Sequence, residues 1–299
     1  MAEILRSQIS SLGNEAWDTE FSDGIHCFSD GGHSPAFAIV EIRLQMLSSF
    51  NTLGDVMSLS CADYYKKLHY ACGEVLTASF AADTAGLHAS SHSFVSDLEQ
   101  WYALLKVRPE GPILKAALAE YQFALLAVVQ GQYRQAFMAL RLSFELLMGT
   151  SYLSANEFQL RQWLRGERDL VWSALIDAKS GVLSKQFVKA FYEELAEETL
   201  QYQAMGQEVY RECSEYVHGN ALTHTSLDGN VSFQQKVFDV WHDKAKTIRL
   251  VSSFALCARY VYLTDSTNRS KLETVLIDNL GHIPAVRRIL GAPVEQSNV

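Results

Sequence analysis

The sequence predicts an all-α protein, and three observations lead to this prediction. Only 5 prolines and 17 glycines interrupt the 299 residues, which favours long helices over many short strands. Apolar residues recur at helical spacing, for example at Phe37, Val40, Leu44 and Leu47. Hydrophobic residues make up 48% of the chain and charged residues 20%, as is typical of a chain that folds around a core.

The strongest break in the helical pattern is the proline- and glycine-containing cluster Arg108–Pro112. Before it, two successive turns lead to a helix that begins at Ser34-Pro35, with serine as N-cap and proline at the first helical position. Further helices are expected over residues 60–82 and 92–107. The chain is therefore predicted to have two parts, an N-terminal helical region over residues 1–108 and a second domain over residues 113–299.

The second domain is predicted to consist of successive helices that include an antiparallel pair. Gly131 makes a tight turn between helices expected over residues 113–129 and 133–149, so these two helices should pack as an antiparallel pair. The next expected helices cover residues 157–176, 184–218 and 232–263. Two short C-terminal helices follow, one of them over residues 271–280, capped by Ser270 and ended by Gly281.

Composition and charge exclude several classes of protein. Five scattered cysteines indicate reduced thiols and a cytoplasmic location rather than a disulfide framework. We see no signal peptide, and apolar runs such as FALLAVV at 123–129 are too short to cross a bilayer, so no membrane association is expected. The net charge of −9 means that an anionic ligand needs a local site rather than a generally basic surface.

No metal or cofactor site is expected. The cysteines and histidines have no zinc-knuckle spacing, and the sequence contains no C-x-x-C; the residues concerned are His26, Cys27, His33, Cys61, His69 and Cys72. His88 and His92 are four residues apart, but no nearby acidic or cysteine residue completes a ligand set. The sequence also lacks a P-loop, a dinucleotide-binding glycine motif and a G-x-S-x-G motif.

The stretch YRECSEYVHGN places Arg211 and His218 near the end of the helix expected over residues 184–218. Seven helical steps return to almost the same direction, about 10.5 Å along the axis, so the two side chains share one polar face. The opposite stripe of this helix is apolar and is formed by Leu195, Tyr202, Val209, Cys213 and Tyr216. The simplest interpretation is an ordinary helix end, with Arg211 paired to Glu208 and Glu215 and with Gly219 after the last turn.

The stretch from Arg211 to His218 also resembles the R-x(4–6)-H motif of the HEPN superfamily, the higher eukaryote and prokaryote nucleotide-binding domains. The resemblance covers residues 113–265 and implies an up-and-down helical bundle that cleaves RNA without metal. It assigns His218 as general base or acid at the ribose and Arg211 as the group that neutralises the phosphate. We expect Ser214, Asn220 and Arg141 to bind the substrate.

The same resemblance implies partners and a biological setting. HEPN proteins commonly form homodimers through the motif helix, and many are toxins or effectors of antiviral defence, with an antitoxin or defence-system protein as partner. Active members often carry Asn, Asp or His after the arginine, where this chain has Glu212. The alternative is therefore a non-catalytic HEPN-like scaffold that mediates protein–protein or nucleotide binding. A structural helical protein in which the motif is an accident is a third hypothesis.

Two further groups of arginines could bind RNA or could form ordinary ion pairs. Arg134 and Arg141 share one face of the helix expected over residues 133–149, and an ion pair between Arg141 and Glu145 is the simpler expectation. Arg161, Arg165 and Arg168 lie near Trp163, on which a base could stack. Because Glu167 and Asp169 are interleaved with them, a solvated helix face is expected instead.

Overall fold

The computed structural model describes residues 60–81, 84–218, 221, 223, 227 and 230–291. The chain divides into two compact units, residues 1–58 and 59–299. The first unit, and with it the helix expected to begin at Ser34-Pro35, lies outside the described residues.

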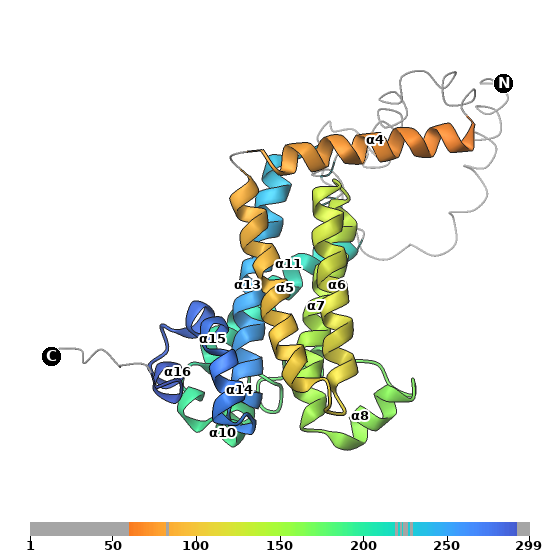
Figure 1. Cartoon of the computed structure of the whole chain (residues 1–299). Coiled ribbons are helices and arrows are strands. Elements are labelled where there is room, and N and C mark those ends of the chain that lie inside the picture. The colour runs from red at the N-terminus through yellow and green to blue at the C-terminus, as the bar shows by residue number, and fades with distance from the viewer. Residues whose placement is uncertain are drawn as a thin grey trace, which may run out of the picture. The chain divides into compact units, whose positions relative to one another are not determined.

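The described residues fold into helices and contain no strand, which confirms the predicted all-α class (Figure 1). The long helices are α4 (Cys61–Ser79), α5 (Ala85–Leu105), α6 (Gly111–Val129), α7 (Tyr133–Ser154), α11 (Thr199–Val217) and α13 (Gln235–Tyr260). The short ones are α8 (Glu157–Leu164), α9 (Trp172–Leu175), α10 (Lys185–Phe191), η1 (Glu193–Leu195), η2 (Val261–Leu263), α14 (Ser266–Lys271), α15 (Glu273–Leu280) and α16 (Pro284–Ile289).

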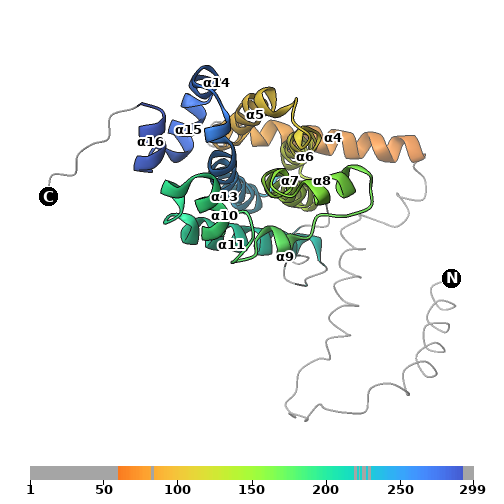
Figure 2. The ribbon, with the colours of Figure 1, turned by 90° about the horizontal axis from the view of Figure 1, so that it is seen from below.

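The long helices form a bundle around α13 and α7. Helices α6 and α7 pack along each other as the predicted antiparallel pair, and α5 packs on α6 and α13. Helix α11 covers the groove between α7 and α13, as the end-on view in Figure 2 shows. The largest fully buried side chains are aromatic and come from all of these helices, namely Phe94 and Trp101 from α5, Tyr121 from α6, Phe137 and Phe144 from α7, Tyr202 from α11, and Phe238, Trp241, Phe254 and Tyr260 from α13. One continuous apolar core therefore holds the bundle together.

The segment Arg108–Pro112, where the sequence suggests a domain boundary, lies inside the second unit: residues 106–110 form a tight turn after α5, and Gly111 and Pro112 begin α6. The buried Glu110 carboxylate accepts a hydrogen bond from Arg108 Nε at 2.6 Å. It accepts another from the Tyr260 hydroxyl at 3.1 Å, which ties the turn to α13. Residues on both sides of the turn, such as Leu105 and Ile113, belong to the same core.

Two helices that the sequence predicts as continuous are broken in the structure. The helix expected over residues 157–176 separates into α8 and α9, because Gly166 adopts a φ of +71° after α8 and ends it. The helix expected over residues 184–218 separates into α10, η1 and α11. Tyr192 lies at the first of these breaks with φ −152° and ψ 82°, and its hydroxyl donates a hydrogen bond to the Ala285 carbonyl at 2.8 Å. A contact with the C-terminal helices thus turns the chain out of helical geometry.

The C-terminal helices differ from the prediction at their start. Ser270 was expected to cap a helix over residues 271–280, but its Oγ donates to the Ser266 carbonyl at 3.0 Å within α14. The capping residue is Asp265, whose carboxylate accepts from the Asn268 backbone N–H at 2.7 Å at the start of α14. Gly281 ends α15, as expected.

Helix α6 is, among the described residues, the one helix long and apolar enough to cross a bilayer by length and composition. Half of its apolar window is buried inside the bundle. The apolar stretch thus extends beyond the run FALLAVV at 123–129. Because half of its window is buried, we interpret α6 as a core helix of the bundle.

Gly131 makes the turn between α6 and α7 at a φ of +73°. A Cβ atom at this position would lie 3.1 Å from Val75 Cγ2 and 3.3 Å from Val231 Cγ1, so the site combines strained backbone with tight packing. Gly166 has nearly the same φ, but a Cβ there would meet open space. The two glycines therefore form a matched pair that separates backbone strain from crowding.

We expect Gly131→Ala to lower the free energy of unfolding by about 2 kcal/mol and Gly166→Ala by about 1 kcal/mol, because both lose the left-handed conformation but only Gly131 is crowded. Urea titration followed by circular dichroism measures both values. Equal losses in the two variants would show that the contact with Val75 carries no energy.

Candidate functional site

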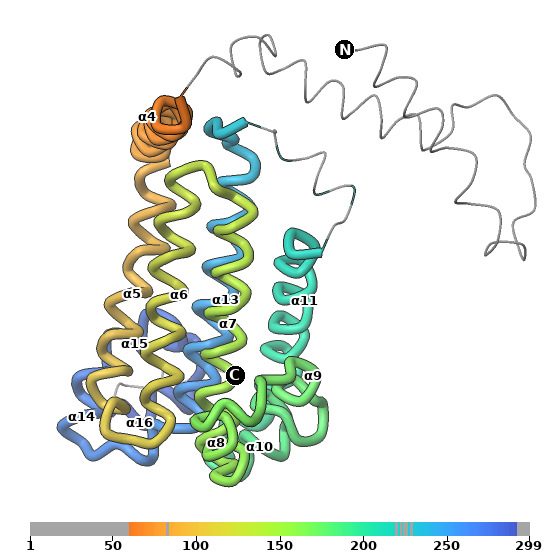
Figure 3. The backbone as a smooth tube through the Cα atoms, turned by 90° about the vertical axis from the view of Figure 1, so that its right-hand side faces the viewer, coloured from red at the N-terminus to blue at the C-terminus, as the bar shows by residue number. Residues whose placement is uncertain are grey.

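Helix α11 presents two opposite faces. Its inner face buries Tyr202, Val209 and Cys213 against the core, as the apolar stripe in the sequence predicts. Arg211 and His218 lie on the outer face and are both exposed to solvent. Figure 3 shows α11 at the edge of the bundle, with its outer side free of other labelled helices. The motif pair is therefore accessible to a large ligand or to a second protein chain.

The end of α11 is stabilised by a neighbouring cation. His218 is the C-cap residue, with an extended backbone at φ −83° and ψ 145°, and its N–H donates to the Ser214 carbonyl at 3.0 Å. From α7, Arg134 Nη1 donates to the Tyr216 carbonyl at 2.7 Å. A helix C-terminus carries partial negative charge on its unpaired carbonyls. The Arg134 guanidinium offsets this charge and so reduces the repulsion of an anion beside His218.

Arg211 does not form the ion pairs expected of an ordinary helix end. Within the part of the chain that the structure describes, its side chain makes no hydrogen bond or ion pair, either with Glu208 or with Glu215. The adjacent Glu212 points to α13, where its carboxylate lies 2.6 Å from Lys244 Nζ. The donors of the Arg211 guanidinium therefore remain available to an external anion.

Arg141, which the sequence suggests as a substrate-binding residue, is instead part of a link between α7 and α11. Its Nη2 lies 3.3 Å from Glu145 Oε1, which confirms the expected ion pair, and it also donates to the Tyr210 hydroxyl. Tyr210 in turn donates to Glu145, and its ring stacks on Trp172 with centroids 3.7 Å apart. This closed set of contacts fixes the residue immediately before Arg211.

The other predicted substrate-binding residues have different positions. Ser214 is half-buried, and its Oγ donates to the Tyr210 carbonyl at 2.7 Å, so it bonds within its own helix. Asn220 and Gly219 lie outside the described residues. Cys213, beside the motif, is fully buried, and burial raises the pKa of its thiol to about 12. At neutral pH this thiol is protonated and unreactive.

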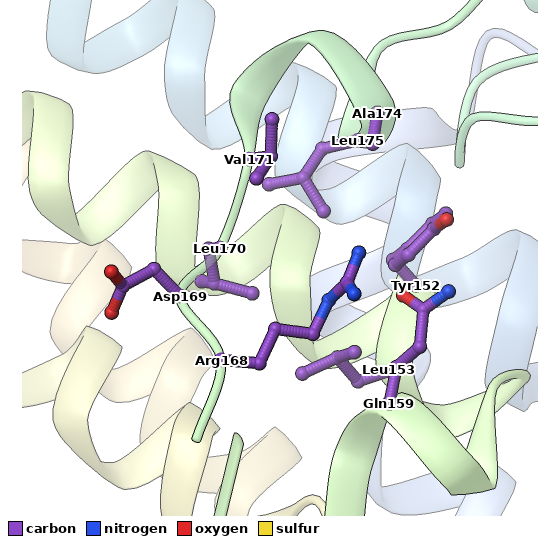
Figure 4. A pocket seen from close by; sticks show the side chains of 9 residues that line it. All are labelled: Tyr152, Leu153, Gln159, Arg168, Asp169, Leu170, Val171, Ala174 and Leu175. Carbon is purple, nitrogen blue, oxygen red and sulfur yellow. The ribbon is translucent and has the colours of Figure 1, made fainter. Parts of the chain in front are cut away.

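The arginines near Trp163 are mostly engaged on the surface. Arg161 pairs with Glu157 at 2.6 Å and Arg165 with Glu167 at 3.1 Å, in agreement with the expected solvated face. Arg168 reaches over a small hollow, while Asp169 points away from it (Figure 4). The hollow is lined by Tyr152, Leu153, Gln159, residues 168–171, Ala174 and Leu175. In the described part of the chain, no group of three potential metal ligands comes together.

Sequence reasoning missed a buried polar cluster between α5 and α13. The Ser91 Oγ lies 2.7 Å from His242 Nδ1, and the His88 and His242 rings meet edge to face with centroids 5.5 Å apart. Burial, and then the neighbouring His92, lowers the pKa of His88 to about 4; burial, and then His88, lowers that of His242 to about 3. The i, i+4 spacing of His88 and His92 is a sequence signal for the part of this cluster on α5. No local signal indicates that His242, from a distant segment, joins it.

Comparison with known proteins gives no match: no family model, no curated protein and no solved structure is significantly similar to this chain. The residues of the site itself are therefore the guide to function.

Proposed function

We propose that this protein is a metal-independent endoribonuclease of the HEPN type that acts as a homodimer through α11, as an effector of antiviral defence or of a toxin–antitoxin pair. The observation that carries the proposal is the solvent exposure of the motif pair. Arg211 and His218 both face solvent, and Arg211 has no partner within the described residues. An arginine and a histidine kept accessible on one helix face suit a ligand that brings negative charge and an exchangeable proton.

The proposed reaction uses the 2′-hydroxyl of RNA as nucleophile. The His218 imidazole accepts the proton of this hydroxyl while the 2′-oxygen attacks phosphorus, and the 5′-oxygen of the next nucleotide leaves and takes up a proton. The products are a 2′,3′-cyclic phosphate and a free 5′-hydroxyl. Arg211 binds the non-bridging phosphate oxygens, whose charge increases in the transition state.

The geometry of one helix explains why a dimer is part of the proposal. Residues seven apart on a helix are rooted about 10.5 Å from each other along the axis, too far for both side chains to hold one phosphate easily. In a two-fold dimer with antiparallel motif helices, Arg211 of one subunit approaches His218 of the other. The site is then complete only when two copies associate.

The direct test is digestion of RNA by the purified protein in the presence of EDTA. We expect cleavage to continue with EDTA and to yield cyclic phosphate and 5′-hydroxyl ends. A matched oligonucleotide with a 2′-deoxyribose at the cleaved position should resist cleavage there, because the nucleophile is missing. Cleavage of the deoxy position, or its loss with EDTA, would contradict the mechanism.

A non-catalytic scaffold is favoured by a different observation, the large apolar side chains exposed on the bundle. Phe123 and Leu126 on α6 and Met138 and Leu142 on α7 are all more than two-fifths exposed. Exposed side chains of this size are typical of surfaces that bind another protein. If the protein is a scaffold, Phe123→Ser should abolish its cellular effect while His218→Ala leaves that effect unchanged, and the reverse pattern supports the nuclease.

A further inference from the structure

Helix α4 differs from the other long helices because, among the residues that the structure describes, few pack against it. It lies across the end of the bundle and extends beyond α6 (Figures 1 and 2). Val75 and Ser79, near its C-terminal end, are its buried residues, and Val75 contacts the Gly131 turn. Residues 61–72 are exposed or half-buried throughout. Nothing in the described core requires the side chains of this outer part of α4.

The outer part of α4 carries aromatic and basic side chains together. Tyr65 and Tyr70 are 64% and 71% exposed, which is unusual for residues of this size. By helical spacing, Lys66 and His69 lie between them on the side opposite Val75. Lys67 adds a second lysine, and no acidic residue occurs between Asp63 and Glu74. This surface, residues 64–70, is therefore locally basic in a chain whose net charge is −9.

Within the described part of the chain, the charges of this surface are only weakly neutralised. Lys66 lies 3.1 Å from Asp63, and both are solvent-exposed, so this pair contributes little. The pKa of Asp63 is lowered by hydrogen bonds from Ser60 and then from Lys66, which keeps this one carboxylate ionised. Within the described residues, Lys67 has no ion-pair partner. A polyanion can therefore replace solvent at this surface without breaking a strong internal contact.

We propose that residues 64–70 of α4 form a binding site for single-stranded RNA, separate from Arg211 and His218, which holds the substrate during cleavage. Tyrosine rings stack on bases of any type, and lysines contact the phosphates between them. Charge complementarity favours RNA over a hydrophobic partner, since lysines and a histidine separate the rings. The C-terminal end of α11 points toward the end of the bundle that α4 crosses (Figure 3). The inference rests on the proposed ribonuclease function for the identity of the RNA as substrate.

Binding is measured by fluorescence anisotropy of a labelled oligouridylate with full-length His218→Ala protein, which does not cleave the probe. We expect Tyr65→Ala and Tyr70→Ala each to weaken binding about tenfold, because each removes one stacked base. Lys66→Gln combined with Lys67→Gln should reduce the dependence of log affinity on log salt by about 1.4, because each lysine lost removes about 0.7 on a single strand. The matched controls are Tyr262→Ala, an exposed tyrosine on η2, and Lys185→Gln with Lys189→Gln on α10, all expected to bind as the parent does.

The proposal fails if the α4 variants bind RNA as tightly as the parent, or if the control variants lose as much affinity. It also fails if the α4 substitutions change the sedimentation coefficient or the binding to anionic lipid vesicles but not the RNA affinity. In these cases α4 contacts a second copy of the chain or a membrane. Failure of the two proposals can be told apart. If RNA binds through α4 but is not cleaved, the binding site is supported and the ribonuclease proposal is wrong. If RNA is cleaved but the α4 variants bind it as the parent does, the ribonuclease is supported and the α4 binding site is wrong.

Discussion

His218→Ala lowers the rate of RNA cleavage by about 10²- to 10⁴-fold, the usual contribution of a general acid–base group. Arg211→Ala has an effect of similar size, because the phosphate loses its charge partner in the transition state. Both side chains are exposed, so neither substitution removes packing and both variants should unfold at the same urea concentration as the parent. The measurement is single-turnover cleavage of a labelled RNA in EDTA.

Two control variants test whether removing any exposed arginine or histidine lowers the cleavage rate, or only removing those of the motif. Arg165→Ala removes an exposed arginine that pairs with Glu167, and His92→Ala removes an exposed histidine on α5. Neither should change the cleavage rate by more than about twofold, since surface substitutions away from a site have small effects. Equal losses in a control and in its matched motif variant would assign the effect to general electrostatics.

Mixing the two inactive variants tests whether the site is shared between subunits. In a mixed dimer of Arg211→Ala and His218→Ala subunits, one composite site keeps both native residues and the other loses both. With random exchange, half of the dimers are mixed and each has one of two sites intact, so roughly a quarter of the parental activity returns. If Arg211 and His218 act within one chain, mixing restores nothing.

The second large effect concerns stability in acid. His88 and His242 are buried with pKa values of about 4 and about 3, whereas an unfolded histidine titrates near 6.5. Between these values the unfolded chain binds more protons than the folded one, so the free energy of unfolding falls as the pH drops below 6.5. At pH 5 each of the two histidines should lower the free energy of unfolding by about 2 kcal/mol relative to pH 7.

The contribution of these histidines can be isolated by comparing variants across pH. His242→Asn keeps a polar group opposite Ser91 but cannot be protonated, so its unfolding free energy should depend less on pH between 6.5 and 4. His69→Asn, which removes an exposed histidine on α4, should leave the shape of the profile unchanged. Guanidinium titrations at several pH values give both profiles. Parallel profiles for the parent and His242→Asn would show that acid sensitivity arises elsewhere.

The sequence was sufficient for elements whose signals are local. The antiparallel pair of α6 and α7 follows from apolar spacing on both sides of Gly131, and the inward stripe of α11 follows from Tyr202, Val209 and Cys213. Gly166 also carried a local signal, since glycine after a basic turn commonly ends a helix. The prediction of one helix over residues 157–176 overlooked it.

Other features depend on contacts between distant segments and have no local signal. Tyr192 interrupts the helix expected over residues 184–218 because it bonds to Ala285, and neither glycine nor proline marks the break. The pairing of Ser91 with His242 likewise joins residues 151 positions apart. At the motif, Arg211 was expected to bond within its own helix, yet only the structure shows that Glu212 turns to Lys244 and that Arg134 reaches the end of α11.

The central position of α13 has a consequence for how the protein is made. Helices α5, α7, α10 and α11 all pack against it, yet it ends only at Tyr260. On the ribosome, the earlier helices emerge with their core-facing aromatic rings uncovered, and no partner can close the bundle until the last turns of α13 have been translated. The nascent chain is therefore a natural client for chaperones that shield apolar surface until α13 has emerged.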